Sequence, residues 1–248
     1  MEGHKGQITL DAEMILDRLL TGEPLALVRY GDGEAMVLNA LNDPAVYTRV
    51  LKRQFGRIPT WEDALKIREN LIFSLQNADI IGYKLNVREG RFDYWSRSKQ
   101  ILDEYVEPKQ YCCIDIGYDF IEKGYFDRLF ARFDRVLYIS CRDVRAQLQA
   151  KGVRSDGFHI APEMMFTSYD GPAHYPDQFV KIESWMDKRD CRTLCLVGAG
   201  VAGKIYVNWF RDRGGVAFDI GSVFDTWAGY VTRGPERAKD KKTNENIL

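Results

Sequence analysis

The chain has 248 residues, of which 45% are hydrophobic and 29% charged, so it has the composition of a globular protein with a sizeable core. Its formal net charge of -1 at pH 7 gives no electrostatic reason to expect nucleic acid or an anionic membrane as a partner. No apolar run reaches the ~20 residues that span a bilayer, and the amino terminus lacks the apolar core of a secretory signal. We therefore expect a cytoplasmic protein without a transmembrane segment.

The cysteines and histidines narrow the possible chemistry. The five cysteines include no C-x-x-C pair, and their odd number argues for reduced thiols in a reducing compartment. With three histidines in the whole chain, we do not expect a zinc site.

Short apolar runs alternate with amphipathic stretches along the chain, a pattern that predicts strands and helices in turn. The predicted strands are 25–30, 79–83, 111–116, 135–140, 157–161, 194–197 and 216–220. The predicted helices are 9–20, 32–41, 60–76, 94–105, 118–133, 144–151, 176–188 and 200–213. This alternation predicts an α/β fold, a single Rossmann-like domain over residues 1–234 with a mostly parallel sheet flanked by helices. Residues 235–248 are polar and charged, and we expect them to form a flexible tail.

The residues that follow the predicted strands are the first candidates for a functional site. In parallel sheets, ligands bind at the carboxyl ends of the strands, where the amino termini of helices gather. These positions carry acids, basic residues and glycines: Gly31–Glu34, Lys84, Gly117, Cys141–Asp143, Pro162, Glu163, Gly198–Gly200, Gly221 and Ser222. Such a mixture suggests a site for a phosphate-bearing ligand with a metal ion.

The first predicted strand ends in LVRYGDGEAM, where Asp32 and Glu34 flank one glycine. Two carboxylates at this spacing can share one divalent cation, and Mg²⁺ or Mn²⁺ would take phosphate oxygens as further ligands. Gly31 and Gly33 would let a ligand approach the backbone, and Arg29 could pair with a phosphate. The alternative is that Asp32 caps the following helix while Glu34 lies in its first turn.

A second glycine turn lies near the carboxyl end. Gly198, Gly200 and Gly203 fit G-x-G-x-x-G, and Asp219 lies near the ~20-residue offset of a ribose-binding acid. A dinucleotide fold begins with this turn, however, and only about fifty residues follow Gly198 here, enough for one more strand. We therefore interpret Gly198, Ala199 and Gly200 as a diphosphate cradle whose backbone N–H groups hold a phosphate. The alternatives are a true NAD or FAD site and glycines that serve only close packing.

Three segments resemble glycosyltransferases of the GT-D fold. RYGDGE at Arg29–Glu34 resembles the RFGDGE segment that opens these enzymes, and APEMMFTSYD at Ala161–Asp170 is similar to their P-E-x-x-x-F segment. Leu196–Trp227 is similar to their final glycine loop, helix and D-I-G strand end. The resemblance implies a metal-assisted transfer of a sugar from a nucleotide donor to an acceptor hydroxyl. It also implies that Asp32 and Glu34 form the D-x-E motif that binds the metal and the donor diphosphate.

These observations predict a hexosyltransferase-like enzyme that uses a nucleotide sugar, foremost a UDP-sugar, with Mn²⁺ or Mg²⁺ and a glycan or glycoconjugate acceptor. Arg29, Arg142 and the N–H groups near Gly198–Gly200 would stabilise the leaving diphosphate, and Asp219 could bind the ribose. For Arg142, a surface ion pair with Asp143 is the alternative.

The general base is open among three carboxylates. They are Glu163, Asp115 and, in a second role, Glu34. A nucleotide-dependent oxidoreductase built on the second glycine turn and a non-catalytic nucleotide-binding module are the competing predictions for the whole protein.

Overall fold

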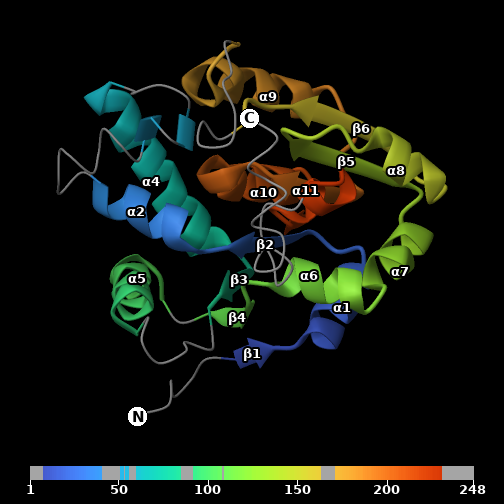
Figure 1. Cartoon of the computed structure of the whole chain (residues 1–248), viewed down its shortest axis with the longest axis horizontal. Helices are drawn as coiled ribbons and strands as arrows, with labels where there is room; N and C mark the ends of the chain where they lie inside the picture. Colours follow the sequence, from blue (N-terminus) through green and yellow to red (C-terminus); the bar gives the residue numbers. More distant parts are fainter. Residues whose placement is uncertain are drawn as a thin grey trace.

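An eight-stranded sheet runs through the part of the chain that the computed structural model describes, residues 8–40, 51–52, 54–55, 60–84, 92–107, 109–162 and 171–230. All of its strand pairs are parallel, in the order β1-β4-β3-β2-β8-β7-β5-β6 (Figure 1). The strands are β1 (Ile8–Leu10), β2 (Leu25–Arg29), β3 (Ile80–Tyr83), β4 (Gln110–Cys113), β5 (Arg135–Ser140), β6 (Arg154–His159), β7 (Leu194–Gly198) and β8 (Val216–Asp219). The predicted α/β fold with a parallel sheet is confirmed.

Strands β2 and β8 are neighbours in the middle of the sheet, although they come from opposite ends of the chain. The chain runs from β2 to β3 and β4, crosses to β5 and β6 at the far edge, and returns through β7 to β8. The pairing of Leu27 with Phe218 joins the two halves. Because all strands are parallel, the turns after β2, β8, β7 and β5 lie on the same side of the molecule, at the carboxyl ends of the strands.

Helices cover both faces of the sheet and bury an apolar core against each (Figure 1). One face carries α2 (Asp32–Ala40), α4 (Trp61–Asn77), α5 (Phe92–Tyr105), α9 (Phe179–Asp187) and α10 (Gly203–Asp212). The other carries α1 (Ala12–Leu20), α6 (Ile116–Glu122), α7 (Tyr125–Arg132), α8 (Arg145–Ala150) and α11 (Val223–Trp227). Strands covered on both sides read as continuous apolar runs, which is why β2 and β7 were recognisable in the sequence.

Helix α10 is the central helix of its face. A short turn, η2 (Gly200–Ala202), leads into it from β7, and it packs on β2, β7, β8 and α4. Most of its residues are buried, including Tyr206 and Phe210. A polar residue near the start of this helix is therefore held between the sheet and the neighbouring helices.

The structure differs from the prediction at several elements. The predicted strand 157–161 begins three residues earlier, as β6 at Arg154. The predicted helix 9–20 is an edge strand, β1, followed by α1, which starts at Ala12 because the Asp11 side chain accepts a hydrogen bond from the Met14 N–H. The predicted helix 118–133 is two helices, α6 and α7, separated at Gly124, whose φ of 67° is left-handed. Helix α11 was not predicted.

All five cysteines are free, and Cys112, Cys191 and Cys195 are buried, as expected for reduced thiols. In the described residues, no helix is both long enough and apolar enough to cross a membrane. The predicted tail, 235–248, lies outside the described residues.

Candidate active site

An open cavity of about 340 Å³ lies at the carboxyl ends of the strands. Turns from both halves of the sheet line it, as the topology requires. The structure brings together at this cavity ten of the residues predicted for the site: Arg29, Gly31, Asp32, Gly33, Glu34, Arg142, Gly198, Ala199, Gly200 and Asp219. The remaining candidate, Glu163, lies outside the described residues.

The two acids of the turn between β2 and α2 have different surroundings. Asp32, the first residue of α2, is exposed at the cavity and makes no ion pair with any described residue. Glu34 is buried, and its Oε2 accepts a hydrogen bond from the Gly31 N–H at 2.7 Å. A first-turn glutamate that folds back onto the residue before its helix satisfies an N–H group that has no partner within the helix. Of the two acids, Asp32 is therefore the one whose carboxylate is exposed to the cavity without a protein partner among the described residues.

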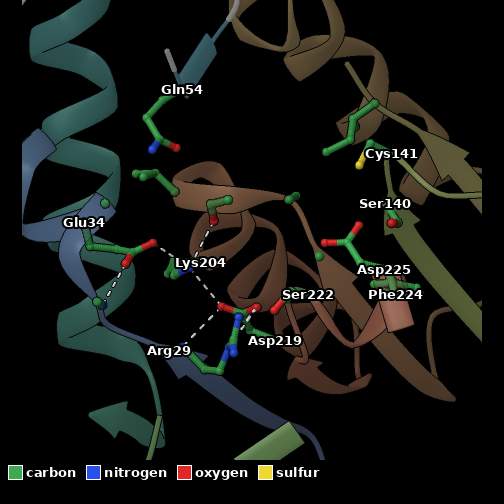
Figure 2. Close-up of a pocket in the computed structure, with 18 of the residues that line it drawn as sticks. Arg29, Glu34, Gln54, Ser140, Cys141, Lys204, Asp219, Ser222, Phe224 and Asp225 are labelled. Atoms are coloured by element: carbon green, nitrogen blue, oxygen red, sulfur yellow. Dashed lines mark hydrogen bonds and ion pairs between the residues drawn. The ribbon is translucent and has the colours of Figure 1, made fainter. Parts of the chain in front are cut away.

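Lys204, in the first turn of α10, is the residue that the sequence analysis missed. Its side chain is 5% exposed, and its Nζ lies 2.6 Å from Glu34 Oε1, 2.9 Å from Asp219 Oδ2 and 3.0 Å from the carbonyl oxygen of Gly200 (Figure 2). A lysine ammonium has three donors, so this one is fully satisfied. Burial lowers the pKa of Lys204, but the carboxylates of Asp219 and Glu34 outweigh it, and the net shift is upward.

Asp219, at the end of β8, lies between two cations. Besides Lys204, its carboxylate faces Arg29, whose backbone N–H lies 3.3 Å from Oδ2 and whose Nε lies 3.5 Å from Oδ1. Burial raises the pKa of Asp219, and Lys204 and Arg29 together lower it below its usual value. Asp219 is therefore a carboxylate held charged by the protein itself, and its predicted contact with a ribose stays a prediction.

The glycines of the second turn have identifiable packing roles. A Cβ on Gly198 would lie 2.5 Å from the Phe224 ring and 2.7 Å from the carbonyl oxygen of Gly221, while one on Gly203 would lie 3.2 Å from the Val197 side chain. Gly200 has a φ of 54°, a left-handed conformation that favours glycine. Close packing and turn geometry thus explain the G-x-G-x-x-G pattern without a dinucleotide.

The opposite wall of the cavity comes from β5 and α11. Arg142 pairs with Asp225 at 2.7 Å between Nε and Oδ1, and its guanidinium lies 4.1 Å from the centre of the Tyr230 ring. Asp143 pairs instead with Arg145, so the alternative of an Arg142–Asp143 surface pair is wrong. Figure 2 shows Asp225 across the cavity from Glu34, with Lys204 between them.

Two further groups at the cavity bear on proton transfer. Asp115 is 53% exposed, and its Oδ2 lies 3.5 Å from Lys84 Nζ. His174 is buried, with its Nε2 2.9 Å from the hydroxyl of Tyr206. Burial lowers the pKa of His174 to about 4, so the ring is neutral at pH 7.

The surroundings of Asp32 and Glu34 bear on the predicted sharing of one divalent ion between them. Both Glu34 oxygens already have partners, whereas Asp32 is an exposed carboxylate at the mouth of the cavity. In the described part of the chain, no group of three or more His, Cys, Asp or Glu side chains is arranged to hold a metal. Asp32 thus fits an ion that keeps waters and takes phosphate oxygens as ligands, whereas Glu34 already faces the Lys204 ammonium and the Gly31 N–H, and a shared ion stays a prediction.

Comparison with protein families identifies the fold that holds this site. The model of the GT-D-like family, described as a GT-D fold-like domain, matches residues 11–227. The chain belongs to the GT-D-like family. Its match covers the turn after β2, the turn after β7 and the whole of β8, so the cavity lies within the family domain.

Solved structures with the same fold are distant in sequence from this GT-D-like protein. A glycosyltransferase from Streptococcus sanguinis, of the domain of unknown function 1792, is 17% identical with a TM-score of 0.63, covering 89% of this chain and 83% of that one. A second structure of that domain, described as having a distinct glycosyltransferase fold, is 14% identical with a TM-score of 0.59, covering 92% and 84%. No curated protein matches the sequence. These likenesses establish the GT-D fold.

Proposed function

We propose that this GT-D-like protein is a glycosyltransferase that moves a sugar from a nucleotide-diphosphate donor, foremost a UDP-sugar, to a hydroxyl of a glycan or glycoconjugate. One observation carries the proposal: the turn after β2 and the turn after β7 meet at one cavity, over a buried cluster of charges. The two turns are the segments predicted to bind phosphate, and the family has a glycosyltransferase fold. Their convergence at one cavity suits a diphosphate donor.

The donor diphosphate would lie between the start of α2 and the turn η2 that leads into α10. The first N–H groups of a helix have no partner within the helix and attract anions. Arg29 at the floor and Arg142 on the opposite wall add guanidinium groups that suit phosphate oxygens. As the bond to the sugar breaks, negative charge grows on the diphosphate, and these fixed donors stabilise it.

Metal dependence is part of the proposal. Asp32 is the side chain that would hold Mn²⁺ or Mg²⁺, because its carboxylate is exposed at the cavity beside the start of α2. A single protein carboxylate with waters and phosphate oxygens is a usual environment for such an ion. When bound, the ion would neutralise charge on the leaving diphosphate.

Asp115 is our candidate for the general base that takes the proton from the acceptor hydroxyl. Of the predicted bases that lie in the described residues, it is the one whose carboxylate is exposed at the cavity. Glu34 is buried, with its oxygens facing the Lys204 ammonium and the Gly31 N–H, so a substrate hydroxyl would reach it less readily than Asp115. Replacing Asp115 with Asn should lower transfer while leaving donor binding unchanged.

A thermal-shift experiment tests the proposal. UDP with Mn²⁺ at about 100 times Kd should raise the melting temperature by roughly 5–10 °C. Asp32→Asn should lose most of this shift. Asp134→Asn removes an exposed acid just before β5, at the amino ends of the strands and away from the cavity, and should keep the shift. Slow release of a nucleoside diphosphate from one of a panel of nucleotide sugars would then identify the donor.

Two outcomes would contradict the proposal. If no nucleoside diphosphate binds in the presence of Mn²⁺ or Mg²⁺, the donor assignment fails. If NADH or FAD stabilises the protein without any metal, the second glycine turn serves a redox cofactor instead.

A further inference from the structure

The buried cluster beneath the cavity contains a cation that belongs to the protein. We propose that Lys204 is a resident cation of this site, holding Glu34 and Asp219 in the way a structural metal ion would, and that Glu34 is a positioning residue rather than a metal ligand. The second half rests on the proposed function, because it concerns the ion that accompanies the donor. The first half concerns the protein alone.

The contacts of the Lys204 ammonium support this role. Its three oxygen partners come from the first helix after β2, from the end of β8 and from the turn after β7. All three donors are used, so the ammonium has none left for a phosphate. The side chain therefore links the two turns at the mouth of the cavity to the sheet beneath them.

Glu34 is fixed by the same arrangement. One oxygen accepts from Lys204, and the other accepts from the Gly31 N–H at the start of its own helix. A metal ion at Glu34 would lie directly against the Lys204 ammonium, which is 2.6 Å from Oε1, and the two cations would repel each other unless that contact broke. Asp32 requires no such change, because it is exposed.

Charge balance shows what the ammonium contributes. Glu34 and Asp219 supply two buried negative charges, which Lys204 and Arg29 offset. Removing Lys204 leaves two buried carboxylates on either side of an empty space, with Arg29 as the remaining cation among the described residues that pair with them. A divalent cation is the ligand that such a space would accept, because buried carboxylates without partners strongly disfavour the folded state.

The first experiment measures thermal unfolding with and without Mn²⁺ and no nucleotide. Lys204→Ala, which vacates the space, should melt well below the wild type in a metal chelator and recover by about 5 °C or more in saturating Mn²⁺. Lys204→Met fills the same space with an apolar chain, so it should be destabilised without recovery. The double variant Lys204→Ala with Glu34→Gln should lose the recovery. If the melting temperature of Lys204→Ala is lowered equally with and without Mn²⁺, the resident-cation role is overturned.

The second experiment measures Mn²⁺ binding in the presence of UDP by electron paramagnetic resonance, and it does not require the Lys204 variants to fold. Glu34→Gln should bind Mn²⁺ within about threefold of the wild type, whereas Asp32→Asn should bind at least about tenfold more weakly. A tenfold loss in both variants would make Glu34 a metal ligand and overturn its positioning role. If the wild type binds no Mn²⁺ with UDP, the proposed function fails, while the first experiment still decides the role of Lys204.

Discussion

The two turns that meet at the cavity have similar glycine-rich sequences but opposite constraints. After β7, Gly198 has no space for a side chain, and the polar residue that follows, Lys204, is buried. After β2, a Cβ on Gly33 would meet only side-chain atoms at 3.4 Å, and the polar residue beside it, Asp32, is exposed. The comparison teaches that packing fixes the turn after β7 tightly, whereas the turn after β2 leaves an exposed acid at the cavity, although their glycines look equivalent in the sequence.

The largest effect should come from Gly198→Ala. The new methyl group would overlap the Phe224 ring and the Gly221 carbonyl oxygen, so the backbone between β7 and α10 must shift. Overpacking of this kind should lower the free energy of unfolding by about 3 kcal/mol or more. Urea denaturation measures the change, and a loss under about 1 kcal/mol would show that the turn is far more adaptable than its packing indicates.

The stability of the protein should also fall in acid because of His174, whose ring forms a hydrogen bond with Tyr206 of α10, the helix that follows the second turn. The folded pKa is about 4, below the unfolded value of about 6.5, so between these pH values the unfolded state binds more protons. The contribution of His174 to the free energy of unfolding is fully present above pH ~6.5. It falls by up to about 3 kcal/mol as the pH falls to ~4.

Denaturation at a series of pH values measures the slope of the free energy of unfolding against pH. His174→Gln should reduce it, and His159→Gln, which removes an exposed histidine at the end of β6, is the control. An unchanged slope in His174→Gln would assign the acid sensitivity to other groups.

At the first turn, Asp32→Asn should change ligand affinity and not stability. The exposed carboxylate has no ion pair with a described residue, so the melting temperature of the free protein should stay within about 2 °C. Affinity for UDP with Mn²⁺ should fall by about tenfold or more, close to 1.4 kcal/mol, by calorimetry. Unfolding of the free variant would place Asp32 with the structural residues instead.

Gly33→Ala, the matched partner of Gly198→Ala, should have little effect on stability. The position lies in the first turn of α2, where alanine favours the helix by up to about 1 kcal/mol over glycine, and the nearest neighbours are the side chains of Gln54 and Val201. We expect unfolding within about 1 kcal/mol of the wild type. Destabilisation as large as that of Gly198→Ala would remove the contrast between the two turns.

Much of the fold could be predicted from local sequence. Strands β2, β5, β7 and β8 lie within one residue of their predicted bounds at each end, because strands buried on both faces are continuous apolar runs. Their parallel arrangement followed from the alternation with helices, and it placed Asp32, Arg142 and Gly198 at one edge of the sheet. The edge strand β1 could not be predicted, since its three residues are a strand only because β4 lies beside them.

The sequence by itself determined the order of strands and helices and the positions at which polar residues leave the sheet, since both depend on periodicity along the chain. Only the tertiary structure decided that Lys204 lies between Glu34 and Asp219, and that Gly198 meets Phe224. Those facts depend on distances between residues far apart in the chain, which no local pattern encodes. The difference in packing between the two turns is therefore a property of the folded protein.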